Sequence, residues 1–206
     1  MQIIDSKNIN SFPPNTFLGY APINEGLSPS ILTPRELKEW QEFTSQARKD
    51  EFLAARHLFH YLLKQGDLNP NFELKKEPLG KPFAQFNDEI LNVSFSHSKE
   101  MVMCAISIES NIGLDIEWSR REVNERLVRR FLSENEWKIF GEENPIKLWT
   151  MKEAAVKCLG TGLRTNLNEL ELRKLQDNEF SIRINDDKSF QICSFQLLDH
   201  QISIAY

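Results

Sequence analysis

Three strand-like runs follow one another in the middle of the chain. Residues 91–96 and 101–108 are joined by a tight polar link, which is typical of a β-hairpin, and residues 112–118 follow as a third strand. Side chains two residues apart in a strand lie on the same face. Asp115 and Glu117 therefore point the same way from an otherwise apolar strand. The centre of the chain predicts a sheet that presents two carboxylates on one face.

Helix signals lie on both sides of these strands. Thr33 and Ser133 each begin a capping box, in which a hydroxyl at the N-cap is followed three residues later by Glu. The helical pattern after Thr33 is expected to break near residues 44–45 and to stop at Gly66. Residues 1–32 are predicted to form strand-like patches broken by prolines, and helices are predicted on both sides of the central strands.

The C-terminal part of the chain returns to strand after one more helix. This helix is expected to begin at Pro145 and to end at Gly160. Strand-like runs follow over residues 180–184, 190–198 and 202–205. This order of elements predicts an α+β protein of two similar-sized halves, residues 1–110 and 111–206. No linker separates the halves, so we expect them to pack tightly.

Composition excludes several classes of protein. The net charge of −5 argues against an extended nucleic-acid-binding surface. No apolar run approaches the length needed to cross a bilayer, and the first residues are neither a basic leader nor an apolar signal. The three cysteines are far apart, and they form neither a metal-binding pair nor a disulfide framework. We therefore expect a cytoplasmic protein without nucleic-acid or membrane partners.

A second pair of charged residues follows the carboxylate strand. Glu153 and Lys157 are one turn apart on the helix that begins at Pro145. Taken singly, Asp115 and Glu117 are explained by a solvent-exposed strand edge. Glu153 and Lys157 are explained by an ion pair on the surface of a helix. Taken together, three acids that can share a divalent cation, with a lysine beside them, suggest chemistry on a phosphate.

Four segments of the chain combine into a family pattern. They are residues 80–82 (Gly-Lys-Pro), 94–98, 112–117 and 149–157. In this order and at this spacing they resemble the 4′-phosphopantetheinyl transferase superfamily, in its longer, synthetase-activating type rather than the short trimeric type. The resemblance is close over residues 79–162, looser over residues 48–63 and weak at the N-terminus. It implies two halves packed as a pseudo-dimer, and a protein that works as a monomer.

The resemblance implies a Mg²⁺-dependent transferase. Such an enzyme moves the 4′-phosphopantetheine arm of coenzyme A onto a serine of an apo acyl or peptidyl carrier protein and releases adenosine 3′,5′-bisphosphate. By resemblance, the magnesium ligands are Asp115, Glu117 and Glu153. These are hard oxygen ligands, and the cation would neutralise charge that develops on the leaving phosphate. Gly113, without a side chain, would let a ligand or a neighbouring backbone come close.

Two of these residues are also expected to take part in the transfer step. Lys157 would place a point charge on the pyrophosphate. Glu153 is the candidate general base for the incoming serine. A metal-activated water is the rival base, because a cation lowers the pKa of a bound carboxylate.

Further residues are expected to contact coenzyme A. The resemblance assigns this role to Arg56, Lys81, Ser96 and His97. Arg48 and Lys49 are weaker candidates, since a helix of this composition would expose basic residues in any case. The chain departs from the family at Ser94, where asparagine is common, and this leaves one local contact to the nucleotide open.

A basic stretch runs from residue 120 to residue 132 and includes the predicted helix 123–131. Its plain explanation is a solvated helix face. Because the carrier proteins of this pathway are acidic, a basic face with an apolar edge would also suit carrier docking. The natural carrier is not specified by the sequence.

Two other functions remain open. A metal-dependent nuclease or phosphohydrolase also uses acids and a lysine, but such nucleases usually place the lysine two residues after the second acid. Here Trp118 and Ser119 follow Glu117, and a protein with a net negative charge offers little surface for binding DNA. A coenzyme A or carrier-binding module without turnover is the other alternative. The presence of all three expected acids and both expected lysines argues against it.

Overall fold

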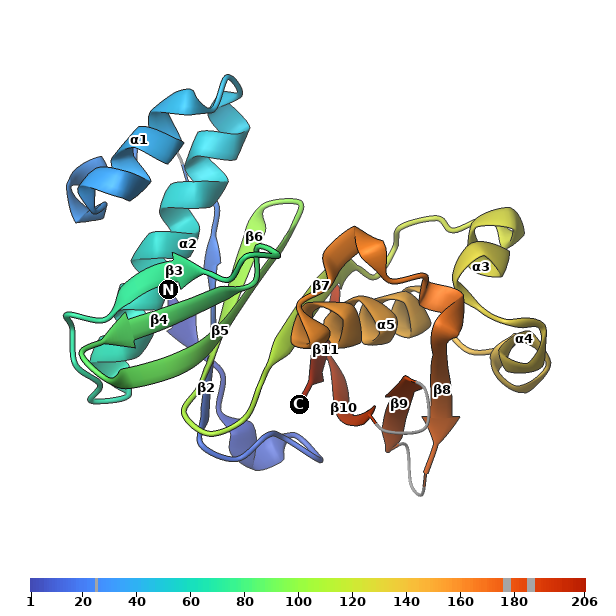
Figure 1. Ribbon diagram of the computed structural model, residues 1–206. Helices are drawn as coiled ribbons and strands as arrows, with labels where there is room; N and C mark the ends of the chain where they lie inside the picture. The colour runs from blue at the N-terminus through green and yellow to red at the C-terminus, as the bar shows by residue number, and fades with distance from the viewer. Residues whose placement is uncertain (25, 176–178, 185–187) are drawn as a thin grey trace.

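Two antiparallel sheets, each with helices packed against it, make up the fold (Figure 1). The computed structural model describes residues 1–24, 26–175, 179–184 and 188–206. The six-stranded sheet has the order β1-β2-β6-β5-β4-β3, and the five-stranded sheet has the order β7-β11-β10-β9-β8. The predicted α+β class is confirmed, and the two sheets are consistent with two halves.

The six-stranded sheet uses the first half of the chain. Its strands are β1 (Gln2–Ile3), β2 (Thr16–Pro22), β3 (Glu73–Lys76), β4 (Pro82–Phe86), β5 (Glu89–Ser98) and β6 (Met101–Ser107). The helices are α1 (Pro34–Glu42) and α2 (Gln46–Gln65), with short 3₁₀ turns η1 (Ser6–Asn8) and η2 (Pro29–Ile31). α2 packs across β2 and β6.

The five-stranded sheet uses the second half. Its strands are β7 (Gly113–Trp118), β8 (Leu170–Lys174), β9 (Phe180–Ile184), β10 (Lys188–Leu197) and β11 (His200–Ala205). The helices are α3 (Glu125–Phe131), α4 (Glu134–Phe140) and α5 (Pro145–Leu159), with 3₁₀ turns η3 (Gly162–Arg164) and η4 (Leu167–Glu169). α5 packs along β7 and β11, while α3 and α4 lie farther out on the same side of the molecule (Figure 1).

Strand β6 explains how the two sheets are held together. All of its residues are buried, and alternate side chains point to opposite faces. Val102, Cys104 and Ile106 pack into the core that includes α2. Met103 and Ala105 face the other way, into a core shared with β7, β10 and β11 of the second sheet. A strand that is covered on both faces reads as a continuous apolar run, which is what the sequence has here.

The predicted helix boundaries are confirmed. Both capping boxes form, at Thr33 with Glu36 and at Ser133 with Glu136. The break between α1 and α2 falls at residues 43–45, and the C-caps of α2 and α5 are Gly66 and Gly160. Gly160 has a φ of +78°, in the left-handed region that favours glycine at this position.

The predicted strands are also present, and three further strands were missed. The hairpin β5–β6 turns at Lys99, and β7, β9, β10 and β11 fall where strand-like runs were expected. β3 and β4 lie in or next to a stretch that the sequence suggests is a polar connection, and β8 follows α5 without a strong signal. β3 and β8 are edge strands. β3 has no fully buried residue, and β8 alternates at only two buried positions, Leu170 and Leu172, so neither run is long enough to stand out in the sequence.

Within the described part of the chain, no helix combines the length and the apolar character that crossing a membrane requires.

Candidate active site

A cavity of about 620 Å³ opens where the two sheets meet. It is lined by α1, α2, β3 and β5 of the first half and by β7 and α5 of the second. Its basic side chains are Arg35, Arg48, Arg56, Lys75, Lys76, His97 and Lys157. Its acidic side chains are Glu36, Glu39, Glu51, Asp115, Glu117 and Glu153. The site is therefore assembled from both halves, and it is rich in charge.

A close approach between β7 and α5 brings the first group of residues together. A Cβ atom on Gly113 would lie 2.0 Å from the Ala154 carbonyl oxygen and 2.3 Å from the Cys158 nitrogen. Only glycine fits there, so the expected close approach is that of a neighbouring backbone. Asp115 lies two residues farther along the same face of β7, where it meets Lys157 of α5.

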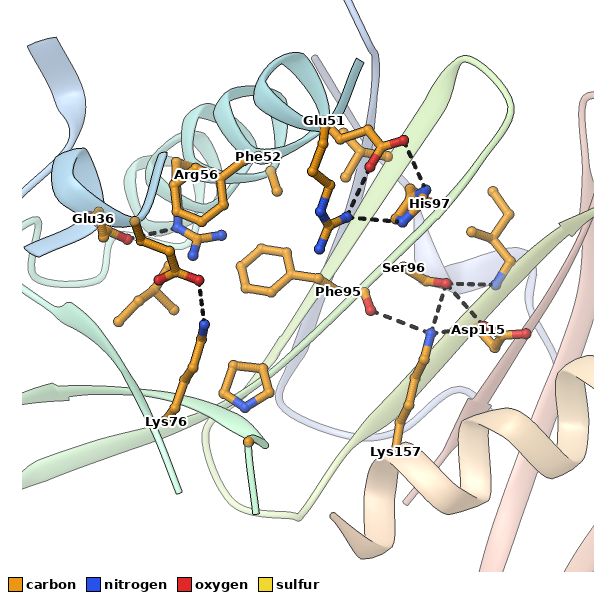
Figure 2. Close-up of a pocket in the computed structure, with 18 of the residues that line it drawn as sticks. Glu36, Glu51, Phe52, Arg56, Lys76, Phe95, Ser96, His97, Asp115 and Lys157 are labelled. Carbon is orange, nitrogen blue, oxygen red and sulfur yellow. Dashed lines mark hydrogen bonds and ion pairs between the residues drawn. The ribbon is translucent and has the colours of Figure 1, made fainter. Parts of the chain in front are cut away.

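Lys157 and Asp115 form the centre of this group. The Nζ atom of Lys157 lies 2.8 Å from Asp115 Oδ1, 2.8 Å from Ser96 Oγ and 2.9 Å from the Leu114 carbonyl oxygen. Figure 2 shows the three side chains converging at one end of the cavity. The other carboxylate oxygen of Asp115, Oδ2, is buried and has no hydrogen-bond partner among the described residues. A buried acceptor of this kind needs a partner that the protein itself does not supply.

Glu117 and Glu153 extend the acidic end. Burial raises the pKa of the Glu153 carboxyl above its ordinary value, and the charge of Asp115 raises it further. Burial likewise raises the pKa of Glu117, although Arg121, 2.5 Å from its Oε1, opposes the rise. The Asp115 charge adds to the rise at Glu117 as well. The three acids are close enough to disfavour one another's charge, and Lys157 offsets only part of that repulsion.

The three predicted magnesium ligands share one end of the cavity without converging on a common point. Among the described residues, no three His, Cys, Asp or Glu side chains form a ready-made metal cluster. Asp115 turns to Lys157, and Glu117 turns to Arg121. Their assignment as ligands stays a prediction.

A second group joins α2 to the end of β5. The Nη1 atom of Arg48 lies 2.9 Å from Glu51 Oε2 and 3.3 Å from His97 Nε2. His97 Nδ1 lies 3.6 Å from Glu51 Oε1, and Figure 2 shows the His97 and Glu51 side chains next to each other. Arginine can only donate, so His97 Nε2 accepts, and its Nδ1–H faces Glu51. Burial lowers the pKa of His97, and the Glu51 charge opposes that shift. His97 is therefore neutral near pH 7.5 in this arrangement.

A third group lies at the far end of the cavity. The guanidinium of Arg56 is 3.8 Å from the centre of the Phe52 ring, and its Nε donates to Glu36 Oε1 at 2.7 Å. Glu36 also closes the capping box of α1, so one carboxylate both starts a helix and orients an arginine. Lys76 of β3 donates to Glu39 of α1 at 2.5 Å. Figure 2 shows Arg56 and Lys76 on the side opposite Lys157.

Two predicted residues do not enter this cavity. Lys81 is buried, and its Nζ donates to the Cys158 carbonyl oxygen at 2.6 Å and to Asn111 Oδ1 at 3.0 Å. It thus joins the end of α5 to the first half of the chain, while its neighbours Gly80 and Pro82 line the cavity. Lys49 packs over the Trp40 ring, 5.1 Å from its centre.

Some lining residues were not singled out from the sequence. Lys76 and Glu51 are the most prominent, because each forms an ion pair at the cavity wall. The one signal for Lys76 is the doublet of lysines shortly before Gly80. Glu51 carries only the weak signal of an i,i+3 pair with Arg48.

This chain is similar in sequence to proteins described as 4′-phosphopantetheinyl transferases. Residues 111–206 match the family model described as the 4′-phosphopantetheinyl transferase superfamily. The chain is 30% identical over 138 residues to the 4′-phosphopantetheinyl transferase gsp of Aneurinibacillus migulanus, which covers 64% of this chain and 56% of gsp. It is 28% identical over 158 residues to the 4′-phosphopantetheinyl transferase HetI of Nostoc sp., covering 69% of this chain and 65% of HetI.

A third relative is matched over more of its length. The chain is 28% identical over 175 residues to the 4′-phosphopantetheinyl transferase Sfp of Bacillus subtilis, covering 78% of this chain and 74% of Sfp. The matches to gsp and HetI span little more than half of the one and just under two thirds of the other.

Proposed function

Because the chain belongs to the 4′-phosphopantetheinyl transferase superfamily, we propose that it transfers the 4′-phosphopantetheine arm of coenzyme A to a serine of an apo acyl or peptidyl carrier protein. The second product is adenosine 3′,5′-bisphosphate. One observation carries the proposal: a single cavity between the two sheets has carboxylates and a lysine at one end and several cations along its other walls. Coenzyme A carries a pyrophosphate and a separate phosphate. The acidic end with its lysine suits the pyrophosphate and a metal ion, and the basic side chains on the other walls suit the separate phosphate.

The chemistry of the donor set fits a magnesium ion. Asp115, Glu117 and Glu153 offer hard oxygen atoms, and the buried Oδ2 of Asp115 lacks a partner among the described residues. Burial raises the pKa values of Glu117 and Glu153, and the charge of Asp115 adds to both rises, so a nearby cation would favour their ionised forms. We propose these three carboxylates as the ligands. A bound Mg²⁺ would offset charge that develops on the leaving phosphate.

The side chains of the protein would carry the remaining parts of the reaction. The serine oxygen of the carrier attacks the phosphorus that bears the pantetheine arm, and the bond from that phosphorus to the bridging oxygen breaks. Lys157 stabilises the charge on the leaving group. Glu153, or a water beside it, takes the proton of the serine hydroxyl. Burial raises the pKa of Glu153, and a raised pKa makes its ionised carboxylate a stronger proton acceptor.

The cations of the first half would hold the nucleotide end of coenzyme A. Arg48 and His97 already lie side by side, and Arg56 is oriented by Glu36 and Phe52. A phosphate that enters between Arg48 and His97 would replace the contacts they now make with Glu51. Residues 1–110 are thus proposed as the half that supplies coenzyme A contacts, and residues 111–206 as the half that carries the metal site.

The basic stretch on α3 is proposed as the carrier-docking surface. Arg120 pairs with Asp199, Arg121 with Glu117 and Arg129 with Glu125. Arg126 and Arg130 are exposed, and no described residue forms an ion pair with either. These two arginines are free to meet an acidic partner and to steer its approach. We further propose that the protein works as a monomer in the cytoplasm, where its three buried thiols stay reduced.

The direct test is intact-mass spectrometry of an apo carrier protein incubated with this protein, coenzyme A and Mg²⁺. The expected result is a mass gain of one phosphopantetheine arm, lost when EDTA is added. Several unrelated carriers should be used, because the natural one is not known. Coenzyme A binding without any mass gain on any of them would favour the binding-module alternative. Hydrolysis of a phosphodiester substrate without a carrier would favour the phosphohydrolase alternative.

A further inference from the structure

We infer that Ser96 is a positioning residue: its hydroxyl holds Asp115 and Lys157 in one arrangement and does not itself contact coenzyme A. This role rests on the proposed function, because it concerns the site at which the metal and the pyrophosphate would bind. It also departs from the family resemblance, which assigns Ser96 a direct contact with the nucleotide.

Three serines on one face of β5 form a ladder to β7. Each hydroxyl accepts a hydrogen bond from a backbone N–H of β7: Ser94 from Leu114 at 2.9 Å, Ser96 from Ile116 at 3.3 Å and Ser98 from Trp118 at 3.0 Å. β7 is the edge strand of its sheet, and these N–H groups lie on its unpaired side. The serine side chains therefore satisfy donors that would otherwise be buried without partners, and they join the two sheets.

Ser96 differs from its two neighbours in the ladder. Its Oγ donates to Asp115 Oδ1 at 3.0 Å and accepts from Lys157 Nζ at 2.8 Å, in addition to the bond from Ile116. A serine hydroxyl has one proton to donate and two lone pairs that accept. All three are used within the protein. A phosphate of coenzyme A could receive a hydrogen bond from Ser96 only if Asp115 lost one.

The contacts form a closed ring. Ser96 Oγ is bound to the backbone of Ile116 and to the side chain of Asp115, which are consecutive residues. The ring fixes the Asp115 side chain relative to its own strand. It also determines which carboxylate oxygen is occupied. Ser96 and Lys157 both bind Oδ1, and Oδ2 has no hydrogen-bond partner in the part of the chain that the structure describes. Ser96 is itself only 6% exposed, whereas the His97 side chain is 46% exposed.

Matched serine variants test this inference. Ser94→Ala, Ser96→Ala and Ser98→Ala each remove one hydroxyl bond to β7, so each should lower the melting temperature. The loss should be largest for Ser96→Ala, which also removes the bonds to Asp115 and Lys157. Only Ser96→Ala should weaken Mg²⁺ binding to the coenzyme A-loaded protein, by about tenfold in calorimetry, because it releases a proposed ligand. The coenzyme A affinity measured without metal should change by less than about twofold.

The outcomes separate the possible roles of Ser96. If Ser96→Ala weakens metal-free coenzyme A binding as much as His97→Ala does, with Mg²⁺ affinity unchanged, Ser96 contacts the nucleotide and the inference is wrong. If Ser94→Ala shifts the Mg²⁺ affinity equally, the effect belongs to the ladder as a whole, and the inference is again wrong. Ser96→Cys, which keeps the side-chain volume but has a weaker donor, should give an intermediate Mg²⁺ affinity and serves if Ser96→Ala does not fold.

The readouts also separate this inference from the proposed function. They are binding constants and melting temperatures, so they do not require transfer. A wild-type protein that binds coenzyme A and Mg²⁺ but modifies no carrier would contradict the proposed function and leave the role of Ser96 measurable. A wild-type protein that binds no Mg²⁺ in the presence of coenzyme A would overturn the inference.

Discussion

Lys152 and Lys157 lie five residues apart on α5, and each is paired with a carboxylate, yet their surroundings are opposite. The Lys152 side chain is 0% exposed, and its Nζ donates to Glu136 Oε2 at 2.8 Å and to the carbonyl oxygens of Phe131 and Leu167 at 2.7 and 3.0 Å. The Lys157 side chain is 32% exposed and faces the cavity. One helix thus carries a structural pair and a candidate catalytic pair.

The difference lies in how completely each pair is satisfied. Lys152 has three N–H donors and three acceptors, and Glu136 also receives bonds from the backbone N–H groups of Ser133 and Leu172. Nothing in that pair is left for a ligand. In the pair of Lys157 with Asp115, one carboxylate oxygen has no partner among the described residues. We call the pair of Lys152 with Glu136 the complete pair and the pair of Lys157 with Asp115 the incomplete pair. The complete pair holds elements of the fold together, whereas the incomplete pair can still bind a ligand.

The largest expected effect is on activity at the incomplete pair. Asp115→Asn should lower the rate of carrier modification by about a thousandfold or more, because it removes a proposed metal ligand and a charge that orients Lys157. Its urea unfolding midpoint should remain close to that of the wild type. Glu136→Gln is the matched control at the complete pair. It should lower the unfolding midpoint while the folded protein keeps its transfer rate, and a loss of rate equal to that of Asp115→Asn would break the comparison.

The next effect is on stability at the complete pair. Lys152→Met should reduce the free energy of unfolding by about 3–5 kcal/mol, because it leaves the Glu136 carboxylate buried without its cation. Lys157→Met should cost about 1 kcal/mol or less, since its ammonium is partly in solvent. Urea titrations followed by circular dichroism measure both. Equal losses of unfolding free energy from the two substitutions would mean that the two pairs contribute equally to stability.

Metal removal tests the incomplete pair in the wild-type protein. With coenzyme A present, Mg²⁺ at about 100 times its Kd should add about 2.7 kcal/mol to the free energy of unfolding, and EDTA should remove that increment. Asp115→Asn should show a much smaller increment at the same Mg²⁺ concentration. A full increment in Asp115→Asn would exclude Asp115 as a ligand.

A smaller effect is expected on the carrier. The carbonyl oxygen of Phe131, the last residue of α3, binds Lys152, so the complete pair also holds the helix that carries the free arginines. The double variant Arg126→Glu/Arg130→Glu should raise the KM for the carrier by about tenfold and leave the KM for coenzyme A unchanged. Lys64→Glu, an exposed charge reversal near the end of α2, is the control. An unchanged carrier KM in the double variant would contradict docking on α3.

The smallest expected effect is a pH dependence at His97. Burial lowers its pKa below 6.5, so it is neutral in the free protein at pH 7.5. A bound phosphate favours the protonated ring, so binding takes up a proton, and the affinity for coenzyme A should rise by a few-fold as the pH falls from 7.5 to 6. His97→Gln should lose that part of the rise. Identical pH profiles for the two proteins would mean that His97 does not contact a phosphate.

The elements with strong local signals were predicted from the sequence, and those without were missed. The capping boxes at Thr33 and Ser133 and the glycine stops at Gly66 and Gly160 depend on a few neighbouring residues, so they can be read directly. The edge strands β3 and β8 could not. β3 has no fully buried residue and resembles a loop, and β8 alternates at only two buried positions, Leu170 and Leu172. β3 mattered most, since it carries Lys76 to the cavity wall.

The candidate site likewise contains residues that the sequence placed correctly and one that it did not. Seven of the eight predicted site residues line one cavity: Arg56, Ser96, His97, Asp115, Glu117, Glu153 and Lys157. Lys81 does not, and only its contacts with Cys158 and Asn111 explain why. Spacing along the chain states which residues share a strand or helix face. It does not state what a long side chain will meet across the gap between two sheets.

The sequence by itself determined the α+β class, most element boundaries, and the face of β7 from which Asp115 and Glu117 project, because periodicity and capping are local properties of the chain. Only the tertiary structure decided that Lys152 of α5 is fully buried and that Lys157 faces the cavity. It also decided that three serines join the sheets and that Asp115 keeps one oxygen without a partner among the described residues. Those outcomes depend on hydrogen-bond partners fifteen or more residues away, which only the folded chain brings together.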